Sequence, residues 1–318
     1  MRLTRTNRAH RAPALRRGIT LPELMVVIVL LSLVVGGIMT VLVKQQRFYT
    51  GTSEIIETKG SARSAIDILS SELRALSTST RGGAPNEVDI YSLTDSSIVF
   101  RSPFGSTVIC TIDPMRTRIT VPPAAMAAGN ALTTFLATPR AGDSLFVFDP
   151  GAQPGTNDDR WTRHALLADP GTGVCPMAPV GLTNNAVEEA AGISLELDPL
   201  LPPAVGVGSA IRFFRTTAYS LYQEADGSWY LGYSNCPGGI CSAREPAAGP
   251  YLPYAAGGLG GLAFNYFDST GVATLDPRAV ARIDITARAQ SYSDLDVAHV
   301  RGKYADSLAV SIAVRNRI

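Results

Sequence analysis

The sequence has few of the residues on which most enzymes rely. Only three of its 318 residues are histidine, namely His10, His164 and His299. It also lacks the Gly-x-Ser-x-Gly, His-Glu-x-x-His and Walker patterns, which are typical of common hydrolases, zinc peptidases and P-loop nucleotide-binding proteins. These absences predict a protein that is not an enzyme and that needs no cofactor.

Charge is absent from the run between Leu24 and Val43. About twenty such residues are what an α-helix needs to cross the hydrocarbon core of a membrane. An ordinary secretory signal would end in a small-residue cleavage site, but no Ala-x-Ala pattern follows Val43. We therefore expect the apolar segment to be retained as a membrane-spanning helix over residues 19–44.

Acidic residues are absent from residues 1–18, which contain six arginines. Without these six, the 28 basic side chains fall to 22 against 27 acidic ones, so the rest of the chain carries a charge of about −5. A basic head on an acidic body does not indicate a nucleic-acid-binding domain. Because arginines precede the apolar run and few basic residues follow it, the N-terminus is predicted in the cytoplasm and the chain beyond Lys44 outside.

Cysteine is scarce, and all four cysteines lie beyond Lys44: Cys110, Cys175, Cys236 and Cys241. An even number in an extracytoplasmic segment indicates disulfides. The turn residues of "CPGGIC" favour a bond between Cys236 and Cys241, which leaves Cys110 to pair with Cys175, although the sequence alone allows three pairings. A zinc site is the alternative, but the Cys-x4-Cys pair lacks a second close Cys or His pair.

Helical periodicity continues beyond the apolar run, across residues 45–80. Apolar residues recur on one helical face, at Ile55, Ala62, Ile66, Leu69, Leu73 and Leu76. This spacing predicts one helix from about Leu21 to Ser77, whose second half lies on a soluble domain. The helix should end at "TRGGAPN", where two glycines and a proline occur.

Helical periodicity is missing from residues 81–318, where short β-type runs alternate with turn residues. The clearest hairpin is "AYSLYQEADGSWYLGYS", in which Asp226-Gly227 suits a primed turn. The segments "PPAAMAAGNA" and "DPGAQPGTNDDRW" are predicted to be loops. The expected fold class is thus α+β, with a long N-terminal helix packed on a mainly antiparallel β domain.

One carboxylate, Glu23, lies at the start of the apolar run, where burial of an unpaired charge would be costly. It follows a basic leader that ends at Gly18 and the residues Ile19-Thr20-Leu21-Pro22. This pattern resembles the class III signal of type IV pilins and type II secretion pseudopilins. The resemblance covers about the first fifth of the chain and implies a pilin-like fold.

The resemblance implies how the N-terminus is processed and used. Prepilin peptidase would remove the leader, residues 1–18, by cutting between Gly18 and Ile19, and Ile19 would be the candidate for N-methylation. Glu23 would then meet the N-terminal amine of a neighbouring subunit inside the filament, so that each charge offsets the burial of the other. Pro22 fits the first turn of a helix, where amide hydrogens have no intrahelical acceptor.

Two departures from the family pattern affect this interpretation. Ile19 stands where Phe or Met is more usual, a difference that bears on N-methylation and not on cleavage. The proline found some twenty residues into many major pilins is missing, and Gly36-Gly37 lies nearby instead. These glycines either weaken the helix locally or allow close packing of helices, and the sequence does not separate the two.

The length of the chain resembles that of minor pilins. The segments "VARIDITARA" and "SLAVSIAVRNR" resemble the closing strands of PilW-type minor pilins, which implies an inner-membrane protein with a periplasmic β domain that enters a pilus with other pilins, in filament initiation or at the tip. The alternative within the family is a GspJ-like minor pseudopilin of a type II secretion system. Outside the family, the alternative is a signal-anchored periplasmic enzyme or binding protein.

One acidic loop could bind a metal ion. Carboxylate and amide oxygens are the ligands that calcium prefers, and the loop "FDPGAQPGTNDDRW" supplies several within a short stretch. The alternative is a loop of solvated acids that binds no ion. The four candidate ligands are Asp149, Asn157, Asp158 and Asp159.

Overall fold

The computed structural model describes residues 18, 20–76, 88–126, 132–153, 158–178, 181–297 and 300–314. It contains one long helix and a mainly antiparallel sheet of fifteen strands, beside a separate two-stranded sheet. The elements in chain order are α1 Leu21–Leu73, β1 Ile90–Leu93, β2 Ser97–Val108, β3 Thr111–Ile112, β4 Arg118–Val121, β5 Thr134–Phe135, β6 Ser144–Asp149, β7 Arg160–Leu166, β8 Gly171–Gly173, α2 Ala186–Ala190, β9 Gly192–Asp198, β10 Ala210–Gln223, β11 Trp229–Asn235, the 3-10 turn η1 Pro237–Gly239, β12 Glu245–Tyr251, β13 Leu262–Phe267, β14 Arg282–Gln290, β15 Leu295–Val297, β16 Val300–Gly302 and β17 Ala305–Ala313.

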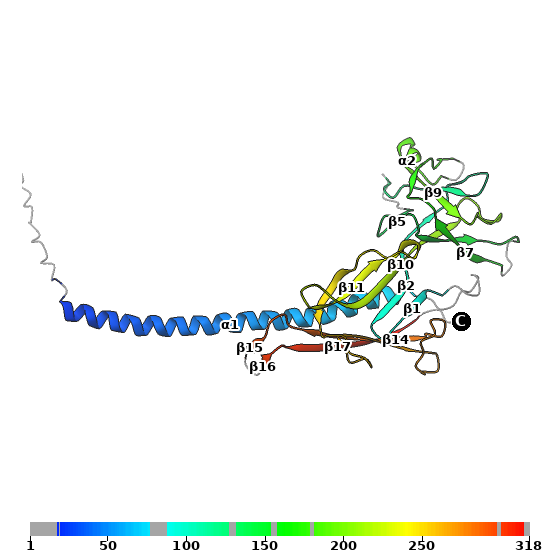
Figure 1. Cartoon of the computed structure of the whole chain (residues 1–318). Helices are drawn as coiled ribbons and strands as arrows, with labels where there is room; N and C mark the ends of the chain where they lie inside the picture. Colours follow the sequence, from blue (N-terminus) through cyan, green and yellow to red (C-terminus); the bar gives the residue numbers. More distant parts are fainter. Residues whose placement is uncertain are drawn as a thin grey trace, which may run out of the picture.

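Helix α1 projects from the β domain as a stalk, with its first half far from every strand (Figure 1). Its first buried residue is Gly51, and the predicted apolar face is buried from Ala62 onward. The helix ends at Leu73, earlier than predicted, and a turn carries the chain to Leu76, which is still buried. Residue 77 lies outside the described residues. The apolar repeat therefore predicts burial correctly up to Leu76, although the helix itself ends at Leu73.

The second half of α1 packs against β12, β14, β15 and β17. Together with the near parts of β2 and β10 these elements form the proximal lobe, residues 88–102 and 214–314 with the helix. Alternate residues of β14 point into its core, because successive side chains of a strand face opposite sides of the sheet. The core includes Leu69, Leu73, Ile98, Phe100, Tyr219, Leu231, Tyr251, Phe264, Ile283, Ile285 and Ile312.

The long strands β2 and β10 continue past the end of the helix and carry a distal lobe, which consists of the described residues between 103 and 213. These two strands pair with each other from Val108↔Ala210 to Ser97↔Ser220, so they run through both lobes. Figure 1 shows β7, β9 and α2 at the end of the domain remote from the start of α1. The distal lobe has its own core, formed by Phe104, Ile109, Ile119, Val121, Leu145, Val147, Leu166, Leu195, Leu197, Leu201, Val205, Ile211 and Phe213.

A buried ion pair connects the proximal lobe to the distal lobe. The Arg215 guanidinium on β10 donates to both carboxylate oxygens of Asp143, at 2.7 and 2.6 Å, and to the Thr138 carbonyl at 2.9 Å. A buried charge of this kind is tolerated because it is paired and hydrogen-bonded. The two lobes are thus joined by polar contacts as well as by continuous strands.

Two local predictions need correction. The segment predicted as a loop through Trp161 already becomes strand at Arg160, where β7 begins. The β10–β11 hairpin forms, but among its loop residues Gly227 has a positive φ, +82°, and Asp226 does not. A primed turn of the Asp-Gly type needs positive φ at both residues. The loop is instead a turn in which the Gly227 amide donates to the Glu224 carbonyl at 3.0 Å. The Asp-Gly pair therefore located the hairpin but not its turn type.

Candidate functional site

Helix α1 begins without a side-chain cap. Thr20 is extended, with φ −82° and ψ 149°, and its side chain makes no cap hydrogen bond. Its carbonyl accepts the first helical bond from the Leu24 amide at 3.1 Å. Pro22 lies in the first turn, where no amide donor is lost. Glu23 is exposed in the same turn, close to the positive end of the helix dipole.

The apolar side chains of α1 between Leu21 and Val43 are exposed all round the helix. Their exposed fractions lie between 44% and 73%, so no face of this half packs on the domain. It is the one described helix that is long and apolar enough to cross a membrane. A contiguous apolar surface of this size indicates burial by something outside the chain, either lipid or other helices.

The few polar side chains inside this apolar span are satisfied by the helix itself. Ser32 donates its hydroxyl to the Ile28 carbonyl at 2.7 Å, and Thr40 donates to the Gly36 carbonyl at 2.8 Å. Helix α1 continues through Gly36 and Gly37 without interruption, and a Cβ added at either would meet nothing within 4 Å. Apart from Glu23, residues 21–43 of α1 present neither charge nor unsatisfied side-chain donors to an apolar surrounding.

Gly18 has open surroundings among the described residues. A Cβ added there would meet nothing within 4 Å. Packing therefore does not explain this glycine. Ile19, the predicted new N-terminus and candidate for methylation, lies outside the described residues, as do residues 1–17.

Hydrogen bonds fix the second half of α1 to the domain. The Ser61 hydroxyl donates to the Gly249 carbonyl, and the Tyr251 hydroxyl donates back to the Ser61 carbonyl, both at 2.8 Å. Burial raises the pKa of Tyr251, so this hydroxyl keeps its proton. Nearer the stalk, the Glu54 carboxylate accepts from the amide and hydroxyl of Ser293. These residues lie beside the apolar stripe, so hydrophobic periodicity gave no signal for them.

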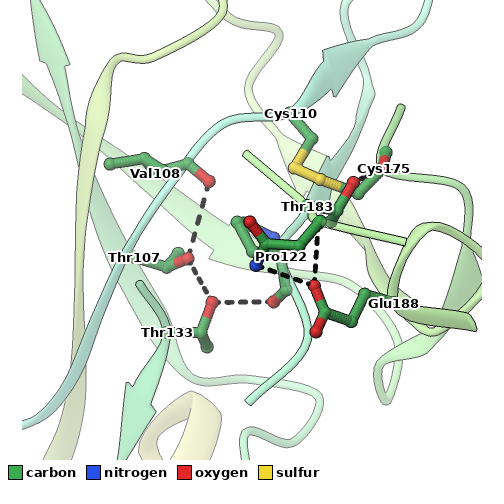
Figure 2. Close-up of a disulfide and its surroundings, with 9 residues drawn as sticks. Thr107, Val108, Cys110, Pro122, Thr133, Cys175, Thr183 and Glu188 are labelled. Atoms are coloured by element: carbon green, nitrogen blue, oxygen red, sulfur yellow. Dashed lines mark hydrogen bonds between the residues drawn. A yellow bond between two sulfur atoms is a disulfide. The ribbon is translucent and has the colours of Figure 1, made fainter. Parts of the chain in front are cut away.

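The structure joins Cys110 to Cys175 and Cys236 to Cys241, which is the pairing that the sequence favours. Figure 2 shows the first bond beside a hydrogen-bonded group of threonines. The Thr183 hydroxyl donates to the Cys175 carbonyl at 2.8 Å, and the Thr133 hydroxyl donates to the Pro122 carbonyl at 2.7 Å. This disulfide therefore connects segments at the far end of the distal lobe.

The second disulfide closes a short loop beside the distal lobe. The Gly238 amide of this loop donates to the Gly142 carbonyl at 2.9 Å. A Cβ at Gly142, where φ is +87°, would lie 2.7 Å from the Gly238 nitrogen, so the close approach requires glycine. Cys236 is buried and Cys241 is exposed. The loop thus holds the end of β11 against the distal lobe.

The calcium candidates mostly have protein partners. Asp149 is buried and forms an ion pair of 2.9 Å with Arg160. Asp158 accepts the Ala152 amide at 2.9 Å, Asp159 is exposed, and Asn157 lies outside the described residues. Within the described ranges, no group of three or more His, Cys, Asp or Glu side chains could hold a metal ion.

His164 is the histidine that the structure describes, and it is buried in the distal lobe. Its Nδ1 lies 2.6 Å from the Pro199 carbonyl, and its Nε2 lies 2.9 Å from the Thr162 hydroxyl. Burial lowers the pKa of the imidazole, although the Pro199 carbonyl and nearby Asp198 oppose this shift. Both ring nitrogens are engaged by the fold, which gives the ring a structural role. His10 and His299 lie outside the described residues.

Comparison with protein families gives one match, at the N-terminus. Residues 14–39 match the model of the prokaryotic N-terminal methylation motif. The matched span includes Gly18, Glu23 and most of the exposed apolar half of α1. Comparisons with curated proteins and with solved structures found no match.

Proposed function

We propose that this chain, which carries the class III signal of type IV pilins and pseudopilins, is a minor pilin of a type IV pilus and a structural subunit with no enzymatic activity. A class III signal implies processing by prepilin peptidase and assembly with other pilins in a filament. The observation that carries the proposal is the uncharged and exposed run of α1 at residues 24–43, directly after that signal. Such a surface needs an apolar partner.

The apolar surface of residues 24–43 would contact lipid before assembly and other helices after it. Before assembly, residues 24–43 would span the inner membrane, with the N-terminus in the cytoplasm and the β domain in the periplasm. In the filament, the helices of neighbouring subunits would replace the lipid. The exchange is feasible because α1 presents no unsatisfied polar side chain in this span.

Glu23 would act at the second stage. Cleavage after Gly18 leaves a positively charged amine on Ile19, and the Glu23 carboxylate of one subunit would pair with the amine of its neighbour. A buried charge is costly when unpaired, so the pair would penalise every register except the correct one. The open surroundings of Gly18 support a role in recognition by the peptidase rather than in folding.

The distal lobe supports a minor, specialised subunit. It stands at the end of the β domain remote from the assembly helix (Figure 1), where it would be presented outward in filament initiation or at a tip. PilW-type minor pilins are the subtype that we favour. A GspJ-like pseudopilin would use the same parts in a type II secretion system.

Mass spectrometry of the membrane-extracted protein tests the proposal. We expect a chain that begins at Ile19, with one added methyl group if this residue is methylated. A chain that retains residues 1–18 would contradict the proposal and indicate a signal-anchored periplasmic protein. Deletion of the gene separates the two machines, since a pilin is needed for surface filaments and a pseudopilin for release of secreted proteins.

A further inference from the structure

Strand β17 forms one edge of the main sheet. All nine of its residues pair with β14, from Ala305↔Gln290 to Ala313↔Arg282, without a shift in register. Among the described residues, no strand pairs with its other edge. Such an edge carries a row of backbone donors and acceptors that another chain can use.

Two hydrogen bonds at the ends of the ladder show which backbone groups point outward. The Ser291 amide donates to the Tyr304 carbonyl at 2.8 Å, and the Val314 amide donates to the Ala281 carbonyl at 2.9 Å. In an antiparallel ladder, hydrogen-bonded pairs alternate with pairs that are not bonded to each other. The even residues between 304 and 314 therefore bond to β14, and the odd residues 305–313 direct their amides and carbonyls to the open edge.

Among the described residues, these outward backbone groups have almost no hydrogen-bond partners. One of them, the Ser307 amide, donates to the carboxylate of Asp306 at 2.9 Å, and no other hydrogen bond to this edge is formed within the described part of the chain. Proteins usually blunt an edge with lysine, proline, a bulge or a covering loop. Strand β17, "ADSLAVSIA", contains no lysine or proline, and its ladder has no bulge; its one charged residue is Asp306, near its start.

The edge at β13, beyond the other side of β14, is closed by the protein itself. The Phe264 amide donates to the Asp95 carbonyl at 2.8 Å, and the Thr274 amide donates to the Tyr266 carbonyl at 3.0 Å. Loops thus cover β13, whereas no described segment covers the outer edge of β17 along its nine residues. This difference between two edges of one sheet indicates that the open edge is kept for a partner.

The side chains of β17 suit close approach of a second chain. Even residues such as Val310 and Ile312 pack inward toward α1, which holds the strand in place. The odd residues are alanine or serine and all are exposed, so they leave space beside the open backbone and bring no charge.

We propose that β17 docks an extended segment of a neighbouring filament subunit, which adds to the sheet as a further strand. This inference rests on the proposed function, since assembly through residues 21–43 gathers subunits around α1, and β17 runs beside the second half of that helix (Figure 1). An extended backbone is the partner whose donors and acceptors match a bare strand edge along its length. The docking would orient neighbouring β domains after the apolar helices have brought the subunits together.

Hydrogen exchange at single-residue resolution tests the docking. In the detergent-extracted wild-type protein, amides of residues 308, 310 and 312 should exchange slowly, and those of 309, 311 and 313 quickly. In isolated filaments, the second set should slow by at least tenfold, while the first set serves as the internal reference. Unchanged fast exchange at 309, 311 and 313 in filaments would overturn the docking.

A pair of variants at one position supplies an independent test. Ala309→Pro removes an outward amide and places a ring at the edge, but it leaves the bonds to β14 intact, because those come from even residues. Ala309→Val keeps the amide and is the matched control. With equal thermal stability in detergent, Ala309→Pro should enter filaments at least tenfold less than Ala309→Val.

The outcomes separate the two proposals. If wild-type protein enters filaments and Ala309→Pro enters equally well, the docking is wrong and the proposed function stands. If Ala309→Pro unfolds, the exchange measurement on the wild-type protein decides the docking. If wild-type protein is absent from pilus filaments, the proposed function is wrong, and the docking to a pilus subunit is wrong with it.

Discussion

Residues 21–43 of α1 and the β domain differ in where their apolar side chains lie. Residues 21–43 expose every large apolar side chain, whereas the β domain buries two apolar cores and pairs its buried charges internally, as in Arg215–Asp143. The described part of the domain thus buries its large apolar cores within the chain, whereas residues 21–43 need apolar contacts from outside it. Changes in the first region should therefore alter processing and assembly, and changes in the second should alter stability.

The largest expected effect is at Gly18. Gly18→Leu should leave the full-length precursor in the membrane, because the bulky residue would not fit the peptidase while the open surroundings keep the fold unchanged. Immunoblotting of membrane fractions and intact mass measure the outcome. Gly60→Leu is the control, because Gly60 also has open surroundings on α1. Normal cleavage of the Gly18 variant would show that the cut lies elsewhere.

Loss of Glu23 should abolish assembly without affecting the domain. Glu23→Ala leaves the neighbour's amine without its counter-charge, at a cost of about 3–5 kcal/mol for a buried pair. Glu23→Gln tests the charge more narrowly, because it keeps the shape. Both variants should be cleaved and disulfide-bonded yet missing from sheared filaments, whereas Glu57→Gln, an exposed site on the same helix, should assemble. Wild-type incorporation of both Glu23 variants would support the signal-anchor alternative.

Leucine substitutions in the two halves of α1 test the comparison directly. Leu69 is 0% exposed in the proximal core and Leu33 is 70% exposed. Leu69→Ala should lower the free energy of unfolding of the domain by about 2–5 kcal/mol, and Leu33→Ala should change it by less than about 0.5 kcal/mol. Urea unfolding in detergent, followed by aromatic fluorescence, gives both values. Equal destabilisation would mean that the halves are energetically coupled.

The two disulfides should differ in their contribution to stability. They close loops with sequence separations of 65 and 5 residues, and the longer loop constrains the unfolded chain more. Chain entropy alone gives about 4 kcal/mol for Cys110–Cys175 and about 2 kcal/mol for Cys236–Cys241. Paired Cys→Ser variants compared by urea unfolding measure the difference. A larger loss at the short loop would show that its contact with Gly142 outweighs loop entropy.

The sequence predicts the long helix and the short disulfide loop, because both leave a local pattern of apolar or turn residues. A charge-free run and a seven-residue repeat locate both halves of α1, and the turn residues of "CPGGIC" favour the observed short disulfide. These features succeed because burial and tight turns limit which residues can occupy them.

The remainder depends on contacts that the sequence does not display. Strand β2 runs from Ser97 to Val108 without a break, despite Pro103 and Gly105. Pairing with β10 continues through these residues, with one shift in register. The open edge at β17 could not be predicted either, because it depends on the order of the strands in the sheet. Of the candidate site, Gly18 and Glu23 were found from the motif, whereas the Ser61–Tyr251 attachment appears only in the folded chain.

The smallest expected effect is a pH dependence of the distal lobe through His164. Burial lowers the pKa of this imidazole below its ordinary value of 6.5, so the unfolded chain takes up the proton at a higher pH than the folded one. Its contribution to stability is therefore fully present above about pH 6.5 and decreases as the pH falls toward the lowered pKa of the folded state. Urea unfolding between pH 7.5 and 5.0 should show wild type losing more stability than His164→Gln, which cannot titrate. Identical pH profiles for the two proteins would mean that the imidazole is protonated as easily in the folded lobe as in water, and that its contacts with Pro199 and Thr162 do not favour the neutral ring.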